Sequence, residues 1–301
     1  MNFLLRRVLA SLLQFMLLSL LISALFLLAP GDFFTTELAD PQRSRQSLDA
    51  LREARGMNQS WAARYLHWAG SSLRGDFGDS LAYGIPVGRL IAPRLRKTLE
   101  IAGIAWMLAW LFGLGGALAA LKLRVEGTFD PGVAAAAMIP DVVAVSVLLW
   151  LAVWVGFAIT GRWLPIAGLV CAIAPMVFLH ASGALREARE LEFVRIAESR
   201  GISGPPLWLR YIVPAAANPL VSLAGLSVAS AIGSSFVVEV LTGWPGLGPL
   251  FLEAVQARDF PIVQTVLMML AAVLAVSNLI ADLILYRLDP RIRILQTVNR
   301  R

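Results

Sequence analysis

A chain of 301 residues is long enough for two soluble domains of ordinary size. Its composition excludes that arrangement, because 58% of the residues are hydrophobic and only 15% are charged, whereas soluble domains have about 45–50% and about 25%. Too few polar side chains are present to cover a soluble surface, so we expect an integral membrane protein. The single cysteine, Cys171, cannot form an internal disulfide.

Six segments are apolar and long enough to cross a hydrocarbon core of about 30 Å, which takes about 20 helical residues. The first resembles a secretory signal peptide, but its apolar run of 22 residues exceeds the usual run of about 7–15, and no small-residue cleavage site follows it. We therefore predict an all-α polytopic membrane protein with about six spans. The predicted spans are Val8–Ala29, Thr98–Leu121, Gly132–Ile159, Trp163–Leu179, Ile212–Val240 and Pro261–Tyr286.

The distribution of Lys and Arg predicts the orientation of these spans. Fourteen of them lie in the terminal segments and loops of one side, whereas the short loops of the other side contain only Arg162 and Arg258. Basic residues are enriched on the cytoplasmic side of membrane proteins, so both termini are predicted to be cytoplasmic in a cell (inner) membrane protein. The net charge of +6 is thereby explained as an orientation signal, and nucleic-acid binding is not expected.

The chain is predicted to be one transmembrane domain over residues 1–301, with its polar residues concentrated in three segments. These are an outer segment at 30–97, a cytoplasmic loop at 183–211 and an outer loop at 241–260.

The two outer segments differ in the structure that their residues favour. In the first, we expect helices at Ser47–Arg55 and Trp61–Leu73, followed by turns at Gly75 and Gly78. The second contains a run of Gly and Pro at 243–249 that we expect to be too rich in these residues for a helix.

The sequence contains no pattern typical of an enzyme. A phosphate-binding loop, a His-Glu-x-x-His zinc motif and a Gly-x-Ser-x-Gly nucleophile elbow are all absent. The only two histidines, His67 and His180, lie on different segments. We therefore expect this chain to be neither a catalyst nor the binding site of a metal or other cofactor.

The cytoplasmic loop has the pattern of two short helices. Apolar residues recur every three positions from Leu191 to Ala197, which predicts an amphipathic helix at the inner surface. Gly201 is placed to end this helix, and Ser203 to cap a second one that begins with Pro205. Such a pair is suited to docking into a groove of a partner protein. The alternative is a solvated charged loop.

Residues 193–203 (Phe-Val-Arg-Ile-Ala-Glu-Ser-Arg-Gly-Ile-Ser) resemble the coupling loop of ABC-transporter permeases, above all those of the dipeptide, oligopeptide and nickel importers. Similar motifs follow the family's order along most of the chain, and the outer segment resembles that of the first, "B"-type permease of the pair. They are Pro30-Gly31-Asp32, Arg74-Gly75-Asp76-Phe77-Gly78, Trp244-Pro245-Gly246-Leu247-Gly248, Ala257-Arg258-Asp259-Phe260-Pro261 and Asp289-Pro290-Arg291.

This resemblance implies the type I importer permease fold and half of a translocation path. It also implies a second permease subunit, two ATPase subunits that bind ATP and Mg²⁺, an extracytoplasmic solute-binding protein, and no cofactor on this chain. The implied ATPase-coupling residues are Phe193, Val194, Arg195, Ile196, Ala197, Glu198 and Gly201. We expect the apolar side chains among them to form the docking surface, with Arg195 and Glu198 at its rim.

The remaining candidate residues are acids of the predicted spans and the motif of the last outer loop. Acids inside a membrane are costly and often mark a solute pathway, so Asp141 lines a possible translocation path or has a structural role. Glu239 and Asp282 are expected to be structural. The outer-loop motif consists of Trp244, Pro245, Gly246 and Gly248.

The function that these features predict is a permease subunit of an ATP-driven importer for peptides. The same machinery importing nickel or another small solute is one alternative. An ion-coupled secondary transporter and a membrane anchor without transport activity are alternatives of different classes.

Overall fold

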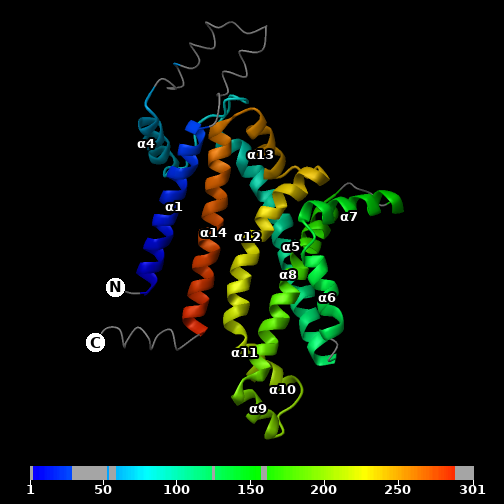
Figure 1. Cartoon of the computed structure of the whole chain (residues 1–301). Coiled ribbons are helices and arrows are strands. Elements are labelled where there is room, and N and C mark those ends of the chain that lie inside the picture. Colours follow the sequence, from blue (N-terminus) through cyan, green and yellow to red (C-terminus); the bar gives the residue numbers. More distant parts are fainter. Residues whose placement is uncertain (1–2, 29–52, 54–58, 124–125, 157–160, 289–301) are drawn as a thin grey trace, which may run out of the picture. The chain divides into compact units, whose positions relative to one another are not determined.

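The computed structural model describes residues 3–28, 53, 59–123, 126–156 and 161–288. Within these ranges the regular structure is helical, with one isolated antiparallel bridge between Asp79 and Pro86 (Figure 1). The predicted helix at Ser47–Arg55 falls almost entirely outside the described residues.

Among the described residues, five helices are long and apolar enough to cross a membrane, which confirms the predicted all-α membrane fold. Helix α8 continues well beyond the predicted end of its span at Leu179, so the first residues of the predicted cytoplasmic loop are helical. Helix α5 likewise begins before Thr98. The five helices are α1 (Phe3–Leu28), α5 (Val87–Leu123), α8 (Trp163–Glu190), α12 (Ala217–Thr242) and α14 (Phe260–Leu288).

The third predicted span, Gly132–Ile159, is not one continuous helix. It contains α6 (Glu126–Ala137) and α7 (Asp141–Val155), which meet at an angle of 99°. Pro140 is the physical reason, since proline has no N–H to continue the helix and disfavours helical geometry in the residue before it. The bent pair counts as a sixth span only if both helices together cross the membrane.

The chain forms two compact units, one of residues 1–98 and 245–273 and the other of residues 99–244 and 274–301. In the first unit, α4 (Trp61–Ser72) packs against α1. The Tyr65 hydroxyl lies 2.7 Å from Ser19 Oγ, and Trp61 Nε1 donates to the Ser23 carbonyl at 3.1 Å. These bonds satisfy polar groups on an otherwise apolar helix.

The glycine turns and the last outer loop also belong largely to the first unit. Gly75 and Gly78 have φ angles of 82° and 81°, as the turn prediction requires. The loop prediction is wrong from residue 247 onward, where α13 (Leu247–Gln256) begins. Pro249 lies in the first turn of α13, where the backbone N–H groups have no partner within the helix, so proline is tolerated there.

Helix α8 is the centre of the second unit, and α6, α7 and α12 all pack against it (Figure 1). Glycines allow two of the close approaches. A Cβ atom at Gly113 of α5 would lie 2.8 Å from the side chain of Val177, and one at Gly168 would lie 3.1 Å from Val145. The helices around α8 therefore pack at backbone distance, as small residues permit in membrane bundles.

Candidate functional site

The predicted amphipathic helix of the cytoplasmic loop is α9 (Glu192–Ser199), and its apolar residues face in two directions. Val194 and Ala197 are 0% and 4% exposed and belong to a hydrophobic cluster with α8 and the start of α12. Phe193 and Ile196 are 50% and 45% exposed. Of the four apolar residues expected to form a docking surface, Val194 and Ala197 instead hold α9 onto its own chain, and Phe193 and Ile196 are the two that remain exposed.

Gly201 ends α9 in the way that the sequence predicts. It has a φ angle of 84°, its N–H donates to the Glu198 carbonyl at 2.9 Å, and the N–H of Ile202 donates to the Ala197 carbonyl at 3.1 Å. These two bonds form a Schellman motif, which satisfies carbonyls at the helix end and requires a left-handed residue. The direction in which the chain leaves α9 is fixed by this glycine.

The second short helix, α10 (Pro205–Leu207), has Gly204 as its N-cap residue rather than the predicted Ser203. Gly204 has φ 68° and ψ −149°, a conformation that is essentially restricted to glycine. A π-helical turn at Trp208–Ile212 and α11 (Val213–Ala215) then lead into α12.

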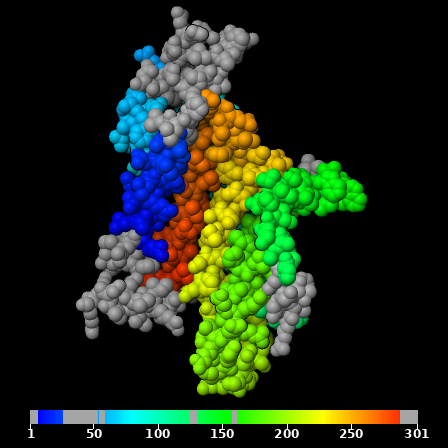
Figure 2. Space-filling model, viewed as in Figure 1, coloured from blue at the N-terminus to red at the C-terminus, as the bar shows by residue number. Residues whose placement is uncertain are grey.

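Helices α9 and α10 pack against each other beside the end of α8 (Figure 1), and Figure 2 shows the light-green surface that this part of the chain presents. Arg195 is exposed, and Glu198 lies 3.9 Å from Arg189 of α8. Two exposed apolar side chains of α9 are therefore bordered by charged ones, as the sequence predicts.

A cavity of about 550 Å³ lies in the second unit, between the bend of α6 and α7 on one side and α8 and α12 on the other. Its walls are mostly apolar, with one carboxyl group, one imidazole and two hydroxyls. The lining residues are Ala137, Asp141, Ala172, Ile173, Met176, Leu179, His180, Ser230, Gly233, Ser234 and Val237.

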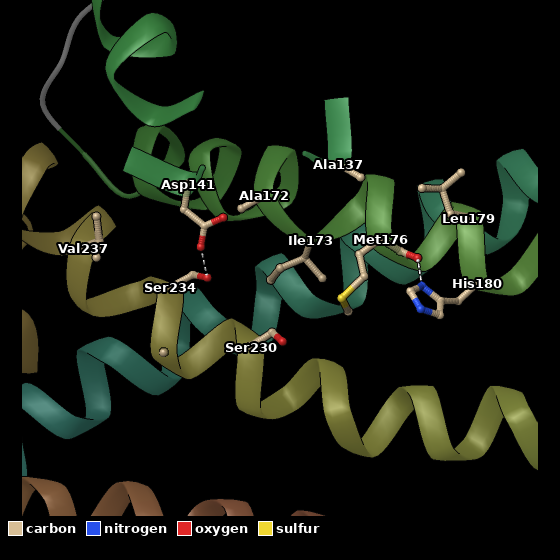
Figure 3. A pocket seen from close by; sticks show the side chains of 11 residues that line it. Ala137, Asp141, Ala172, Ile173, Met176, Leu179, His180, Ser230, Ser234 and Val237 are labelled. Atoms are coloured by element: carbon tan, nitrogen blue, oxygen red, sulfur yellow. Dashed lines mark hydrogen bonds between the residues drawn. The ribbon is translucent and has the colours of Figure 1, made fainter. Parts of the chain in front are cut away.

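Asp141, the candidate of the sequence analysis, is one of the lining residues. It is the first residue of α7, and its carboxyl group points toward α12 and accepts a hydrogen bond from Ser234 Oγ (Figure 3). On α8, the His180 ring contacts the Met176 carbonyl through Nδ1 at 2.8 Å. Since a carbonyl only accepts, this contact places a proton on Nδ1 and leaves Nε2 for other contacts.

The lining residues of α12 were not singled out from the sequence. Ser230 and Ser234 are spaced at i and i+4, so they share one face of α12 with the intervening Gly233. Two serines at helical spacing in an apolar span, with a glycine beside them, are the signal that could have indicated this wall of the cavity.

The outer-loop motif has a structural role in the residues described. The backbone N–H of the half-buried Trp244 donates to the Glu239 carbonyl at 2.9 Å, at the end of α12. In the first unit, Gly246 caps α13 and Gly248 is buried. The N–H of Leu247 donates to Thr98 Oγ1 at 2.9 Å, and Pro245 is exposed. The motif thus fixes where one helix ends and the next begins.

A second cluster of the first unit ties α13 to the preceding outer segment. Asp259 is fully buried and accepts hydrogen bonds from Ser80 Oγ at 2.5 Å and the Ala82 N–H at 2.9 Å. Nearby, the Tyr83 hydroxyl donates to Glu253 at 2.7 Å, and this bond raises the pKa of Tyr83 above its usual value. The tyrosine therefore remains a hydrogen-bond donor at neutral pH.

Comparisons with known proteins agree with this architecture. Residues 111–294 match the family described as "Binding-protein-dependent transport system inner membrane component". The chain is 31% identical to a probable peptide ABC transporter permease protein of Sinorhizobium fredii, over 97% of this chain and 99% of that protein. It is 29% identical to the oligopeptide transport system permease protein AppB of Bacillus subtilis, over 88% and 90%.

Solved structures show the same fold. The inward-facing methionine ABC transporter MetNI matches with a TM-score of 0.57 at 18% identity, over 66% of this chain and 96% of that chain. An amino acid ABC transporter matches with a TM-score of 0.54 at 17% identity, over 66% and 94%.

The chain therefore belongs to the family of binding-protein-dependent inner-membrane transport components, and the resemblance to ABC-transporter permeases is confirmed. Its fold is that of ABC importer permeases, and it is a multi-pass membrane protein. Membership of this family makes it a transport subunit rather than an enzyme.

Proposed function

We propose that this chain is the first permease subunit of an ATP-driven importer of peptides and provides half of its translocation path. Its partners in this proposal are a second permease subunit, two ATPase subunits that bind ATP and Mg²⁺, and an extracytoplasmic solute-binding protein. The names of relatives at 31% and 29% identity support a peptide substrate over nickel.

The observation that carries the proposal is the division of α9 into a buried and an exposed apolar face. Val194 and Ala197 are buried against the chain's own core, so α9 is firmly attached to α8 and α12. Phe193 and Ile196 remain exposed, and apolar side chains with a charged border are typical of a docking surface. A helix attached in this way transmits the movement of a docked ATPase to the membrane helices.

The cavity supplies the second half of the argument. Transport requires a place for solute within the membrane, and the cavity is lined by the middle parts of α8 and α12. Asp141 lies in its wall, which supports its assignment to the translocation path.

A docking-surface variant tests coupling. Replacing Phe193 and Ile196 together with alanine removes both exposed apolar side chains, and interface residues of this kind contribute about 2 kcal/mol or more each when central. We expect at least a tenfold loss of ATPase co-purification and a matching loss of ATP-dependent uptake in proteoliposomes.

The matched control is Leu111→Ala, an apolar residue of α5 that is 65% exposed. This variant should retain both ATPase co-purification and ATP-dependent uptake.

Uptake of trialanine that requires ATP and the solute-binding protein is the expected result for the unmodified importer. Uptake driven by a proton or sodium gradient without ATP would contradict the proposal, as would a double variant that couples normally.

A further inference from the structure

The cavity is lined by the middle of α8 and by the second half of α12. Its α8 residues fall between Ala172 and His180, in the middle of a helix that runs from Trp163 to Glu190. Its α12 residues fall between Ser230 and Val237, beyond the midpoint of α12. Both helices are long enough to cross the membrane, so the polar atoms of the cavity lie in the hydrocarbon region, where polar groups are costly without a functional partner.

The charge of the lining is one-sided. Among the described residues that line it, Asp141 is the one acid, neither Lys nor Arg is present, and His180 is the other titratable residue. The carboxyl oxygen Oδ2 of Asp141 accepts from Ser234, and the hydroxyl of Ser230 lies one helical turn away on the same face of α12. The described lining thus presents a carboxylate with neighbouring hydroxyl oxygens and no Lys or Arg to pair with it, and the His180 ring is bonded through Nδ1 to its own helix at the Met176 carbonyl.

This set of oxygens matches the donors of a primary ammonium group. An ammonium group has three N–H donors and a positive charge, and charge-assisted hydrogen bonds to a carboxylate are about twice as strong as neutral ones. The other walls, including Ile173, Leu179 and Val237, are apolar and suit an aliphatic body. The volume of about 550 Å³ lies within the range of about 300–1,000 Å³ that is typical of small-ligand pockets.

The geometry points to a cation subsite, in which Asp141, assisted by Ser234, binds the primary ammonium group of the solute as it crosses the membrane. For a peptide, this group is the free amino terminus. The inference rests on the proposed function for the identity of the solute, and its own content is the selection of positive charge by the cavity.

Asp141 also has a structural effect that the test must separate from this one. An acid in the first turn of a helix is favourable because the helix N-terminus carries partial positive charge. Loss of that effect would weaken the packing of α7 and alter access to the cavity for cations and anions alike. Loss of a cation subsite instead changes the access of cations relative to that of anions.

The experiment therefore measures charge selectivity directly. Ser230→Cys is introduced together with Cys171→Ala into the complete importer in proteoliposomes, because Cys171 is exposed and does not line the cavity. The rates of modification by a cationic trimethylammonium-ethyl methanethiosulfonate and by an anionic sulfonatoethyl methanethiosulfonate are then compared. Addition of Asp141→Asn should lower the cation-to-anion rate ratio about tenfold, as expected from removing one charge at short range.

Glu100→Gln is the matched control. Glu100 is a half-exposed acid of the same unit, paired with Arg162 at 3.0 Å and absent from the cavity lining. Its substitution should leave the cation-to-anion rate ratio within twofold.

A second readout uses the protection of residue 230 from modification by solute. Trialanine should slow the modification of residue 230 at lower concentration than N-acetyl-trialanine, and Asp141→Asn should abolish this difference.

An unchanged rate ratio in Asp141→Asn would overturn the subsite, as would equal protection by the two peptides before this substitution. A cysteine at 230 that reacts with neither reagent, with or without ATP, would show that the cavity is closed to solute and would also overturn it. Continued ATP-dependent uptake in any of these cases would leave the proposed importer function standing. Absence of ATP-dependent uptake with a normal charge ratio would instead refute the importer function alone.

Discussion

Ser227 shows how single polar groups are accommodated in the apolar bundle of the second unit. Its hydroxyl is fully buried, accepts from Trp106 Nε1 at 2.8 Å and from Trp110 Nε1 at 2.9 Å, and donates to the Ala224 carbonyl at 3.0 Å. One serine of α12 therefore satisfies two indole donors of α5. Buried donors without acceptors are costly, so this residue has a larger role than its size suggests.

Ser227→Ala should destabilise the protein, because two indole N–H groups lose their acceptor at once. The expected cost is about 1–3 kcal/mol, seen as a fall of about 5 °C in the unfolding temperature of the purified permease in detergent. Ser235→Ala is the matched control, since Ser235 is equally buried on α12 and its hydroxyl donates to the Ile232 carbonyl of its own helix. Equal effects of the two substitutions would contradict this role.

At this scale, the sequence predicted the residues whose chemistry is unusual for their surroundings. Asp141 was identifiable because an acid in an apolar span is rare, and Gly201 because a glycine after an amphipathic run marks a helix end. Ser230, Ser234 and Ser227 were not identified, since serine is common in membrane helices and its importance depends on which helix packs opposite.

At the scale of elements, long apolar helices were predicted well and their irregularities were not. Helices α1 and α14 lie close to their predicted bounds, because hydropathy over 20 residues is a strong signal. The break at Pro140 and helix α13 depend on single prolines in particular positions of a turn, and hydropathy does not report on these. The inward turn of Val194 follows from packing on α8, which periodicity alone cannot orient.

Gly201→Val should uncouple transport, because a β-branched residue is strongly disfavoured at a φ of 84°. The Schellman cap of α9 would be lost, and the proposed docking side chains, Phe193 and Ile196, would change direction. We expect ATP-dependent uptake to fall at least tenfold in proteoliposomes. Gly201→Asn is the control, since asparagine tolerates the left-handed region and should retain most of the uptake.

Normal transport by Gly201→Val with the ATPase subunits bound would show that the cap is not needed for coupling. Equal loss in both variants would assign the effect to the side chain at this position rather than to the backbone conformation.

At the scale of the whole molecule, the bent pair α6 and α7 decides whether the number of membrane spans is even or odd. In the part of the chain that the structure describes, five single helices are long and apolar enough to cross the membrane, and the pair makes six if it crosses as one span. An even number places both termini on one side, in agreement with the fourteen basic residues of the predicted cytoplasmic segments. An odd number would place them on opposite sides.

Both termini are therefore expected to be cytoplasmic. A single cysteine near either end, in the Cys171→Ala background, should react with a membrane-impermeant maleimide only after the cells are permeabilised. A cysteine at Arg162, in a predicted outer loop, should react in intact cells and serves as the positive control. Reaction of exactly one terminus in intact cells would mean that α6 and α7 do not form a crossing.

Helix α8 runs without interruption from the lining of the cavity to Glu190, and one extended residue, Leu191, joins it to α9. The continuous helix sets the angle about its axis between the cavity lining and the start of α9. Each residue of an α-helix turns the chain by about 100° and advances it by about 1.5 Å. The number of residues between Met176 and Glu190 therefore decides which way Phe193 and Ile196 face relative to the cavity. Side chains along this stretch of α8 can vary where packing permits, but its length can change only in steps that restore the same phase, close to whole turns.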